Sequence, residues 1–136
     1  MSAAENKQLM RNIFASLAEG DSQTLIDSMD DNIRWKIAAE GAWSRTFESK
    51  QAVITQLFGL LQTKIATRLR ILAYRFIAEN DLVVVEARGK NNISKSGVPY
   101  DNSYCFVFRI AEGKVQEVTE YSDTELGIKT LGGWDS

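Results

Sequence analysis

The feature that most constrains the fold is a change in hydrophobic period after Gln62. Before this point apolar residues mostly recur every three or four positions, which is typical of helices with one buried face. After it they alternate with polar residues, which is typical of half-buried strands. Helices that are separated in this way from a run of strands predict an α+β layer, in which the helices cover one face of an antiparallel sheet.

The pattern predicts helices over 3–19, 21–29 and 49–62, and a short terminal helix over 124–131. A strand at 32–38 interrupts the helices, because Ile33, Trp35 and Ile37 alternate with polar residues. Four further strands are expected at 67–78, 82–90, 98–110 and 114–122. Two short turns and one looser loop, "NNISKSG", join them in sequence, which predicts an antiparallel meander.

Length and composition predict one globular domain over residues 1–136. The net charge is −2 without a basic stripe, so nucleic acid is not an expected partner. The chain has no run of about 18 apolar residues and no secretory leader, so no membrane association is expected. Cys105 is the single cysteine and leaves no internal disulfide, which fits a cytoplasmic protein.

The sequence contains no histidine, and this excludes histidine-dependent triads and histidine-based zinc or iron sites. A single cysteine also excludes thiolate clusters, so we expect no metal site. Acid–base chemistry must then depend on Asp, Glu, Tyr, Lys or water. Proton transfer by such groups needs no metal or organic cofactor, and none is expected.

The last two strands, "YCFVFRIAEGKVQEVTEYSDT" at 104–124, place acids where a buried strand is usually apolar. A three-residue loop at 111–113, with Gly113 left-handed, predicts three pairs on one face: Phe106 opposite Val118, Tyr104 opposite Glu120, and Asn102 opposite Ser122. A two-residue turn would instead pair Glu120 with Cys105 and Tyr104 with Tyr121. We prefer the first register, because it groups Phe106 with Val118 as core.

Glu120, Glu86 and Tyr104 are the candidate catalytic residues. If Glu86 shares the face of Tyr104 and Glu120, two carboxyl groups and a phenol converge beside the helices. Burial and the second carboxylate would then keep one carboxyl protonated near neutral pH. In the alternative interpretation Glu120 is a structural acid that is bonded to Tyr104 or to an arginine such as Arg88.

Asn102, Trp35, Phe58, Phe106 and Asp123 are the candidate ligand-binding residues. Asn102 and Tyr104 would donate hydrogen bonds to a ligand carbonyl, or Tyr104 would only satisfy Glu120. The aromatic residues would form an apolar pocket wall or plain core. Asp123 precedes "TELGIK" and is also suited to cap the terminal helix. Trp134 is a candidate lid over the pocket.

Two segments, "YDNSYCFVFRIAEGKVQEVTEYSDT" (100–124) and "VVVEARG" (83–89), carry a resemblance to the SnoaL-like, ketosteroid-isomerase-like branch of the nuclear transport factor 2 superfamily. With the helix and strand order, the resemblance covers nearly the whole chain. It implies a cone: a strongly curved antiparallel sheet, of the cystatin-like α+β roll type, wrapped around three N-terminal helices. It also implies a pocket in the mouth of the cone and a homodimer formed through the outer sheet face.

The resemblance implies a small-molecule pocket protein, and a cofactor-independent isomerase, cyclase or dehydratase that transfers protons on an apolar, carbonyl-bearing substrate. The alternative is a non-catalytic ligand-binding or dimeric assembly module of the same fold, since fold does not determine activity. Ketosteroid isomerases carry a tyrosine on the first helix, and residues 3–19 contain none. The Asp-Arg-Asp set of the epoxide hydrolases has no clear match either.

Overall fold

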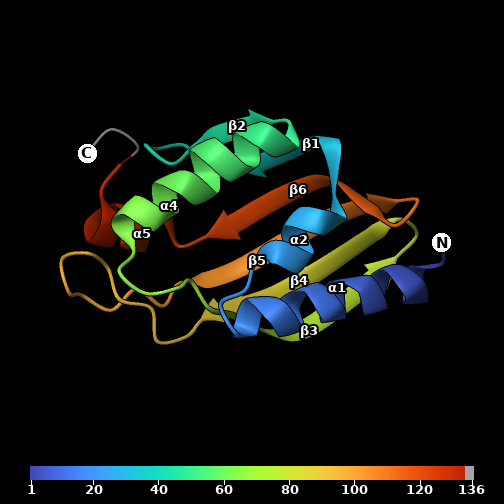
Figure 1. Ribbon diagram of the computed structural model, residues 1–136, viewed down its shortest axis with the longest axis horizontal. Coiled ribbons are helices and arrows are strands. Elements are labelled where there is room, and N and C mark those ends of the chain that lie inside the picture. The colour runs from blue at the N-terminus through green and yellow to red at the C-terminus, as the bar shows by residue number, and fades with distance from the viewer. Residues whose placement is uncertain (134–136) are drawn as a thin grey trace.

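The predicted order of helices and strands is present in the computed structural model, which describes residues 1–133 (Figure 1). The helical segments are α1 (Ala3–Ala18), α2 (Gln23–Ser28), α3 (Lys50–Ala52), the π-helical segment η1 (Val53–Phe58), α4 (Gly59–Lys64) and α5 (Thr124–Leu131). The strands are β1 (Met29–Ile37), β2 (Arg45–Glu48), β3 (Ile71–Glu79), β4 (Leu82–Gly89), β5 (Ser103–Ala111) and β6 (Lys114–Ser122). No helix among these residues is long and apolar enough to cross a bilayer.

Local signals explain where the helices begin and end. Ser2 and Glu5 form a capping box at the start of α1, in which each side chain accepts a hydrogen bond from the other residue's backbone N–H. Gly20 follows α1 with φ of +79°, a conformation that glycine adopts without strain. Ser49 caps the helical run that begins at Lys50, because its side chain accepts from the Ala52 N–H at 3.0 Å.

The strands form one six-stranded sheet in the order β2-β1-β6-β5-β4-β3. The pairs β3–β4, β4–β5 and β5–β6 are antiparallel, which confirms the predicted meander. Two features were not predicted: β2 pairs antiparallel with β1, and β1 pairs parallel with β6. The strand β2 is four residues long and buries only Phe47, so its sequence holds too little alternation to be recognised.

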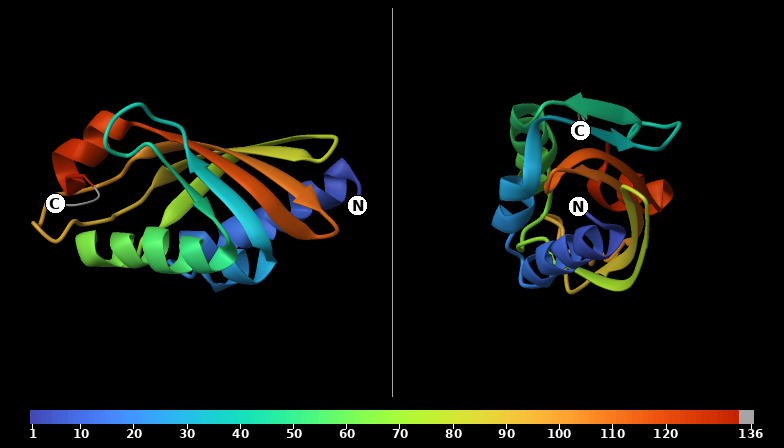
Figure 2. Two further views of the ribbon diagram at one scale, coloured as in Figure 1. Left: turned by 90° about the horizontal axis from the view of Figure 1, so that it is seen from above. Right: turned by 90° about the vertical axis from the view of Figure 1, so that its right-hand side faces the viewer.

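The sheet is strongly curved and wraps around α1, as the view along the long axis shows (Figure 2, right). Register shifts interrupt the β1–β6, β3–β4 and β5–β6 pairs, and such bulges bend a strand and increase its twist. The helix α1 packs on the concave face through Met10, Ile13 and Phe14, which are buried. The predicted α+β cone is therefore confirmed, with one parallel strand pair in a sheet that was expected to be antiparallel.

The turn between β5 and β6 differs from the predicted loop. It has two residues, Glu112 and Gly113, with φ of +54° and +74°. Positive φ at both positions is typical of the type I′ turns that join paired strands. The register shifts between Arg109 and Ile110, where Gln116 is the additional residue on β6. A turn and a bulge together replace the predicted three-residue loop.

The alternative two-residue turn is therefore confirmed next to the turn, where Ala111 pairs with Lys114 and Ile110 with Val115. Beyond the bulge the pairs of both registers are wrong, although the preferred register predicted the correct face. The observed pairs are Phe106 with Glu120, Tyr104 with Ser122, and Phe108 with Val118. They differ from the preferred register by two residues, and side chains alternate with a period of two. Tyr104, Phe106 and Glu120 consequently still lie on the same concave face of the sheet.

Candidate functional site

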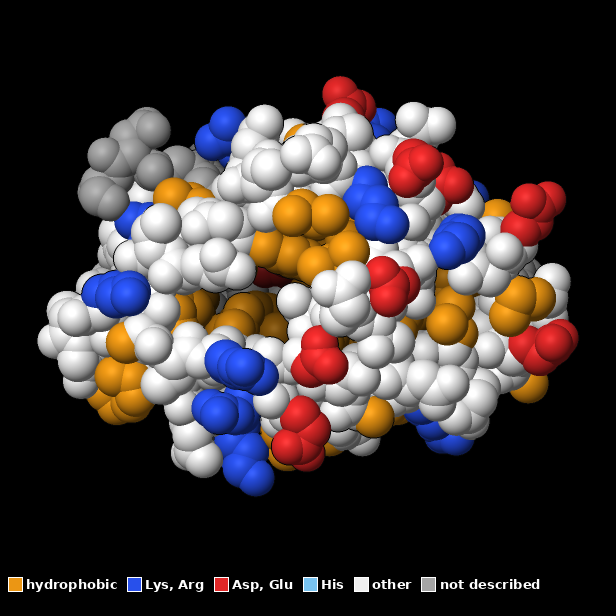
Figure 3. Space-filling model, in the orientation of Figure 1, with side chains coloured by type: hydrophobic (Ala, Val, Ile, Leu, Met, Phe, Trp, Pro, Cys, Tyr) orange, Lys and Arg blue, Asp and Glu red, His pale blue; other side chains and the backbone are white. Residues whose placement is uncertain are grey.

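A cavity of about 480 Å³ lies between the concave face of the sheet and the helices. Its wall is mostly apolar and includes Leu57, Phe58 and Leu61 from the helical run 50–64 and Trp35 from β1. The volume falls within the range of about 300–1,000 Å³ that is usual for small-molecule sites. Figure 3 shows a hollow on this face of the molecule, with hydrophobic side chains around it and charged side chains beside it.

Glu120 is the one carboxylate among the described residues that line this cavity. It lies on β6 next to Ile37 of β1 and opposite Phe106 of β5. Its Oε1 accepts a hydrogen bond of 3.0 Å from the indole Nε1 of Trp35. Burial raises the pKa of Glu120 from 4.5 to about 7, although the bond from Trp35 acts in the opposite direction. Glu120 therefore exchanges a proton near neutral pH.

Two phenols line the cavity together with Glu120. Tyr104 lies on β5, where its ring stacks on Phe106 with 5.3 Å between the ring centroids. Tyr100 precedes β5, and its hydroxyl accepts a hydrogen bond of 2.9 Å from the Asn102 amide. Burial, with contributions from Tyr100 and Glu120, raises the pKa of Tyr104 well above its usual value of 10. Both phenols are therefore neutral at neutral pH and remain hydrogen-bond donors.

The three aromatic candidates all lie on the cavity wall, where they were predicted. Trp35 contacts Phe58 edge to face, with 5.8 Å between the ring centroids, and it contacts Phe106 at 6.4 Å. Phe58 ends the π-helical segment η1, whose wider turn brings Leu57 and Phe58 to the same cavity. These rings surround the carboxyl group of Glu120 with apolar surface, which is the cause of its raised pKa.

Asn102 and Asp123 do not line the cavity, and they hold α5 instead. The fully buried Asn102 donates to the Asp123 carbonyl at 3.0 Å, and its Oδ1 accepts from the Asp123 N–H at 3.1 Å. The side chain of Asp123 caps α5 by accepting from the Leu126 N–H at 3.1 Å. The cap interpretation of Asp123 is therefore confirmed. Asn102 reaches the site only through its bond to Tyr100.

Glu86 lies on the opposite, convex face of the sheet, so the expectation that it shares a face with Tyr104 and Glu120 is wrong. In the β4–β5 register Glu86 pairs with Cys105, whereas Tyr104 pairs with Ala87. Glu86 forms an ion pair of 2.7 Å with Arg75 of β3. The sequence did not define this register, because the irregular segment 90–102 separates the two strands.

The sequence interpretation missed Tyr100 and Trp43, which both line the cavity. Tyr100 continues the alternation of Asn102, Tyr104 and Phe106, and that pattern was a signal for it. Trp43 lies in the loop between β1 and β2, where no periodicity marks it. Its indole Nε1 donates to the Gly132 carbonyl at 2.9 Å, so Trp43 joins this loop to the end of α5. The candidate lid Trp134 lies outside the described residues.

Within residues 1–133 no group of three or more His, Cys, Asp or Glu side chains is arranged to hold a metal ion. The polar groups that the cavity wall brings together include one carboxyl group with a pKa near 7 and two neutral phenols. Such a set is suited to move a proton and to donate hydrogen bonds to an oxygen atom that becomes negatively charged.

Comparison with known proteins supports the fold over the whole length of the chain. A family model for the SnoaL-like domain matches residues 10–118. An NTF2-like protein of unknown function from Burkholderia pseudomallei K96243 superposes with a TM-score of 0.80 at 19% identity, covering 96% of this chain and 98% of the other. A protein from Jannaschia sp. CCS1, proposed to be a SnoaL-like polyketide cyclase, has a TM-score of 0.75 at 18% identity, covering 96% and 93%.

A proposed isomerase from Bacillus subtilis is similar to the same extent, with a TM-score of 0.73 at 20% identity and coverage of 98% and 97%. No curated protein sequence matches the chain significantly. At these identities the superpositions establish the fold, and the chemistry has to be argued from the residues of this cavity.

Proposed function

Because the chain belongs to the SnoaL-like domain family, we propose that its cavity binds a small apolar, carbonyl-bearing molecule and that Glu120 moves a proton on it. One observation carries the proposal: a carboxyl group with a pKa of about 7 is enclosed by apolar side chains beside two neutral phenols. A general acid–base group is most effective when its pKa is close to the working pH. The structural relatives that are proposed to be a cyclase and an isomerase agree with this class of chemistry.

The roles follow from the charge of each group. Ionised Glu120 removes a proton from the carbon next to the carbonyl, and the electron pair of the C–H bond moves to the carbonyl oxygen as an enolate forms. A neutral phenol of Tyr104 or Tyr100 donates a hydrogen bond to that oxygen and stabilises the new charge. Protonated Glu120 then returns the proton to a second carbon atom. This sequence needs a single carboxylate, so the cavity favours an isomerisation.

The proposal is tested by hydrogen–deuterium exchange on a panel of hydrophobic enones and β-diketones in D₂O, followed by proton NMR. We expect the protein to accelerate exchange at the carbon next to the carbonyl for at least one member of the panel. Glu120→Gln should lower this rate by roughly 10²–10⁴-fold, because it removes the proton acceptor and keeps the shape. Glu86→Gln is the matched control, and its rate should equal that of the wild type.

The rate should also depend on pH through Glu120. As a base, Glu120 acts in its ionised form, so kcat/KM should rise about tenfold per pH unit below the pKa of about 7 and level off above it. A Glu120→Gln variant that exchanges protons at the wild-type rate would remove Glu120 from the mechanism.

A second candidate function is ligand binding without turnover. The observation that favours it is the bond from Trp35, which already occupies Oε1 of Glu120. In that case members of the panel would bind in the cavity, their protons would not exchange faster than in buffer, and Glu120→Gln would change only the affinity.

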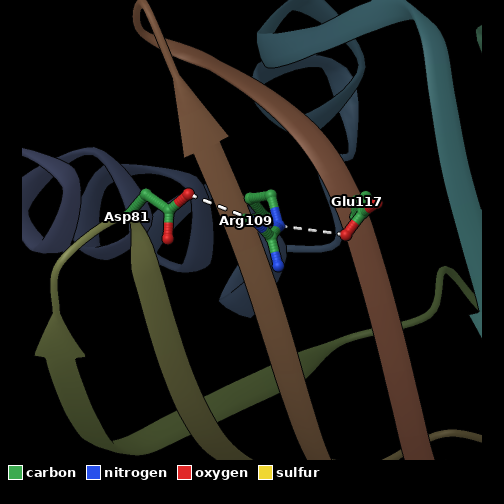
Figure 4. A network of polar contacts seen from close by, with 3 residues as sticks. All are labelled: Asp81, Arg109 and Glu117. Atoms are coloured by element: carbon green, nitrogen blue, oxygen red, sulfur yellow. Dashed lines mark hydrogen bonds and ion pairs between the residues drawn. The ribbon is translucent and has the colours of Figure 1, made fainter.

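We also propose that the protein forms a homodimer through the convex face of the sheet. Three large apolar side chains on strands, Tyr74, Ile77 and Tyr121, are 63%, 53% and 49% exposed on the molecule. Figure 4 shows one network of charged residues at this sheet: Arg109 of β5 lies between Asp81, in the turn before β4, and Glu117 of β6, at 3.5 and 3.0 Å. Apolar side chains with ion pairs beside them are typical of surfaces that join subunits.

A further inference from the structure

The proposed function assigns roles to the depth of the cavity but none to its rim, where two cations lie. Arg68 and Lys95 both line the cavity and are both exposed. Arg68 lies between α4 and β3, and Lys95 lies in the loop between β4 and β5. Glu120, the one carboxylate that the described part of the chain contributes to the cavity wall, is surrounded by aromatic side chains instead. The charged groups of the site are therefore separated: two cations lie at the mouth of the cavity and one carboxyl group lies inside it.

Neither cation is neutralised by a carboxylate of residues 1–133. The ion pairs of residues 1–133 do not include Arg68 or Lys95, so no carboxylate oxygen lies within 4.0 Å of either group. Asp21 follows Gly20 beside this rim, but its carboxylate accepts a hydrogen bond from the Gln23 N–H at 2.9 Å. Both positive charges are free to bind an anion that enters the mouth.

The fold also holds these two residues in place. The aliphatic part of the Arg68 side chain packs against Gly20. A Cβ atom added at Gly20 would lie only 2.9 Å from the Arg68 Cβ. The stem of Arg70 lies against the same glycine and adds a third positive charge to this end of the molecule. The backbone N–H of Lys95 donates to the Lys64 carbonyl at 2.9 Å, which ties its loop to the end of α4.

We propose, on the basis of the proposed function, that the ligand is amphipathic: an anionic group binds Arg68 and Lys95 at the mouth, and an apolar body ends in a neutral hydrogen-bond acceptor at Glu120. The reverse orientation would place an anion against Glu120 inside an apolar cavity, where like charges repel strongly. A carboxylate, sulfonate or phosphate has the chemistry to bind Arg68 and Lys95. The acceptor at the inner end is the carbonyl oxygen on which Glu120 acts.

Two probes with the same ring system separate the contribution of the anion from that of the apolar body. The first is 1-anilinonaphthalene-8-sulfonate, which is anionic, and the second is N-phenyl-1-naphthylamine, which is neutral. Fluorescence titration gives the Kd of each for the wild type and for Arg68→Gln/Lys95→Gln. The control Lys7→Gln/Lys129→Gln removes the same charge from α1 and α5, at two residues that do not line the cavity and do not lie on the sheet.

We expect the rim variant to weaken binding of the anionic probe by roughly 2- to 30-fold, because it removes two exposed ion pairs. Its affinity for the neutral probe should stay within about twofold, and the control should bind both probes like the wild type. Equal effects of the rim variant on both probes, or no effect on either, would overturn the proposal. So would a wild type that binds only the neutral probe.

A cavity-filling variant, Leu61→Trp, distinguishes a failure of the anion-binding proposal from a failure of the proposed function. Leu61 lines the cavity at the edge of the core and is only partly buried, so a larger side chain at this position fills the site and leaves the fully buried core residues unchanged. It should weaken the binding of both probes, and circular dichroism should show that the variant keeps the native helix content. If neither probe binds the wild type, or if Leu61→Trp leaves both affinities unchanged, the proposed binding function itself fails.

Discussion

At the scale of single residues, the chemistry of the site depends on the surroundings of Glu120. The alternation of β6 was enough to predict that Glu120 points toward the helices. Its pKa could not be predicted, because it depends on Trp35 and Phe106, which come from other strands, and on Phe58 of the helical run. These rings reduce the contact of the carboxylate with water, and the Trp35 indole is its one hydrogen-bond partner among the described residues.

The bond from Trp35 gives a prediction about pH dependence. Trp35→Phe keeps an aromatic ring in place and removes the Nε1–H donor, which stabilises the ionised form of Glu120. The pKa of Glu120 should therefore rise above 7, and the pH–rate profile of the exchange reaction should move to higher pH. Phe58→Leu is the control, since it changes the aromatic wall and keeps the indole donor. A larger shift of the pH–rate profile in Phe58→Leu than in Trp35→Phe would contradict the role of Trp35.

The raised pKa also predicts how stability depends on pH. Between pH 4.5 and about 7 the folded protein holds a proton on Glu120 that the unfolded chain releases, so the free energy of unfolding falls as pH rises. Glu120→Gln lacks this group and should gain stability relative to the wild type by about 2–3 kcal/mol between pH 5 and pH 8. Urea unfolding at both pH values measures the difference. A pH-independent difference would show that Glu120 titrates normally.

At the scale of helices and strands, periodicity predicted the elements but not the pairing between them. The four long strands of the meander were recognised because each alternates over eight or nine residues. The bulge at Gln116 and the face of Glu86 were not recognised, because a register depends on turns and irregular segments more than on the strands themselves. The preferred register still identified Tyr104 and Glu120 correctly, since its error was an even number of residues.

The anchoring of α5 gives a prediction at this scale. The side chain of Asn102 makes four hydrogen bonds: it donates to Tyr100 and the Asp123 carbonyl, and it accepts from the N–H groups of Ser103 and Asp123. Asn102→Ala should lower the free energy of unfolding by about 2–4 kcal/mol, because buried partners are left unpaired. It should also increase amide exchange in α5, measured by hydrogen–deuterium exchange with mass spectrometry.

Asp123→Ala is the matched variant at the start of α5. It removes only the side-chain cap of Leu126 and should cost about 1 kcal/mol, since the backbone bonds to Asn102 remain. Equal losses in the two variants would contradict the view that Asn102 is the main attachment of α5.

At the scale of the whole molecule, the curved sheet has two faces with separate roles. The concave face holds the cavity, and the convex face carries the exposed residues of the proposed dimer. Val107 lies on the convex face of β5 between Val84 and Thr119. Sedimentation velocity should give the mass of two chains for the wild type and of one chain for Val107→Lys, because a buried charge without a partner opposes association. Glu40→Lys, in an exposed loop, should remain dimeric, and a monomeric wild type would refute the proposal.

The most direct test of the central claim is a carbon-13 NMR titration of the Glu120 carboxyl group. Protein labelled at the side-chain carboxyl carbon of glutamate is titrated, and the signal that is missing in Glu120→Gln identifies the group. The cavity predicts a midpoint of about 7 for this signal. A midpoint near 4.5, the ordinary value of a solvated glutamate, would mean that water reaches the carboxylate freely and that the proposed acid–base role is wrong.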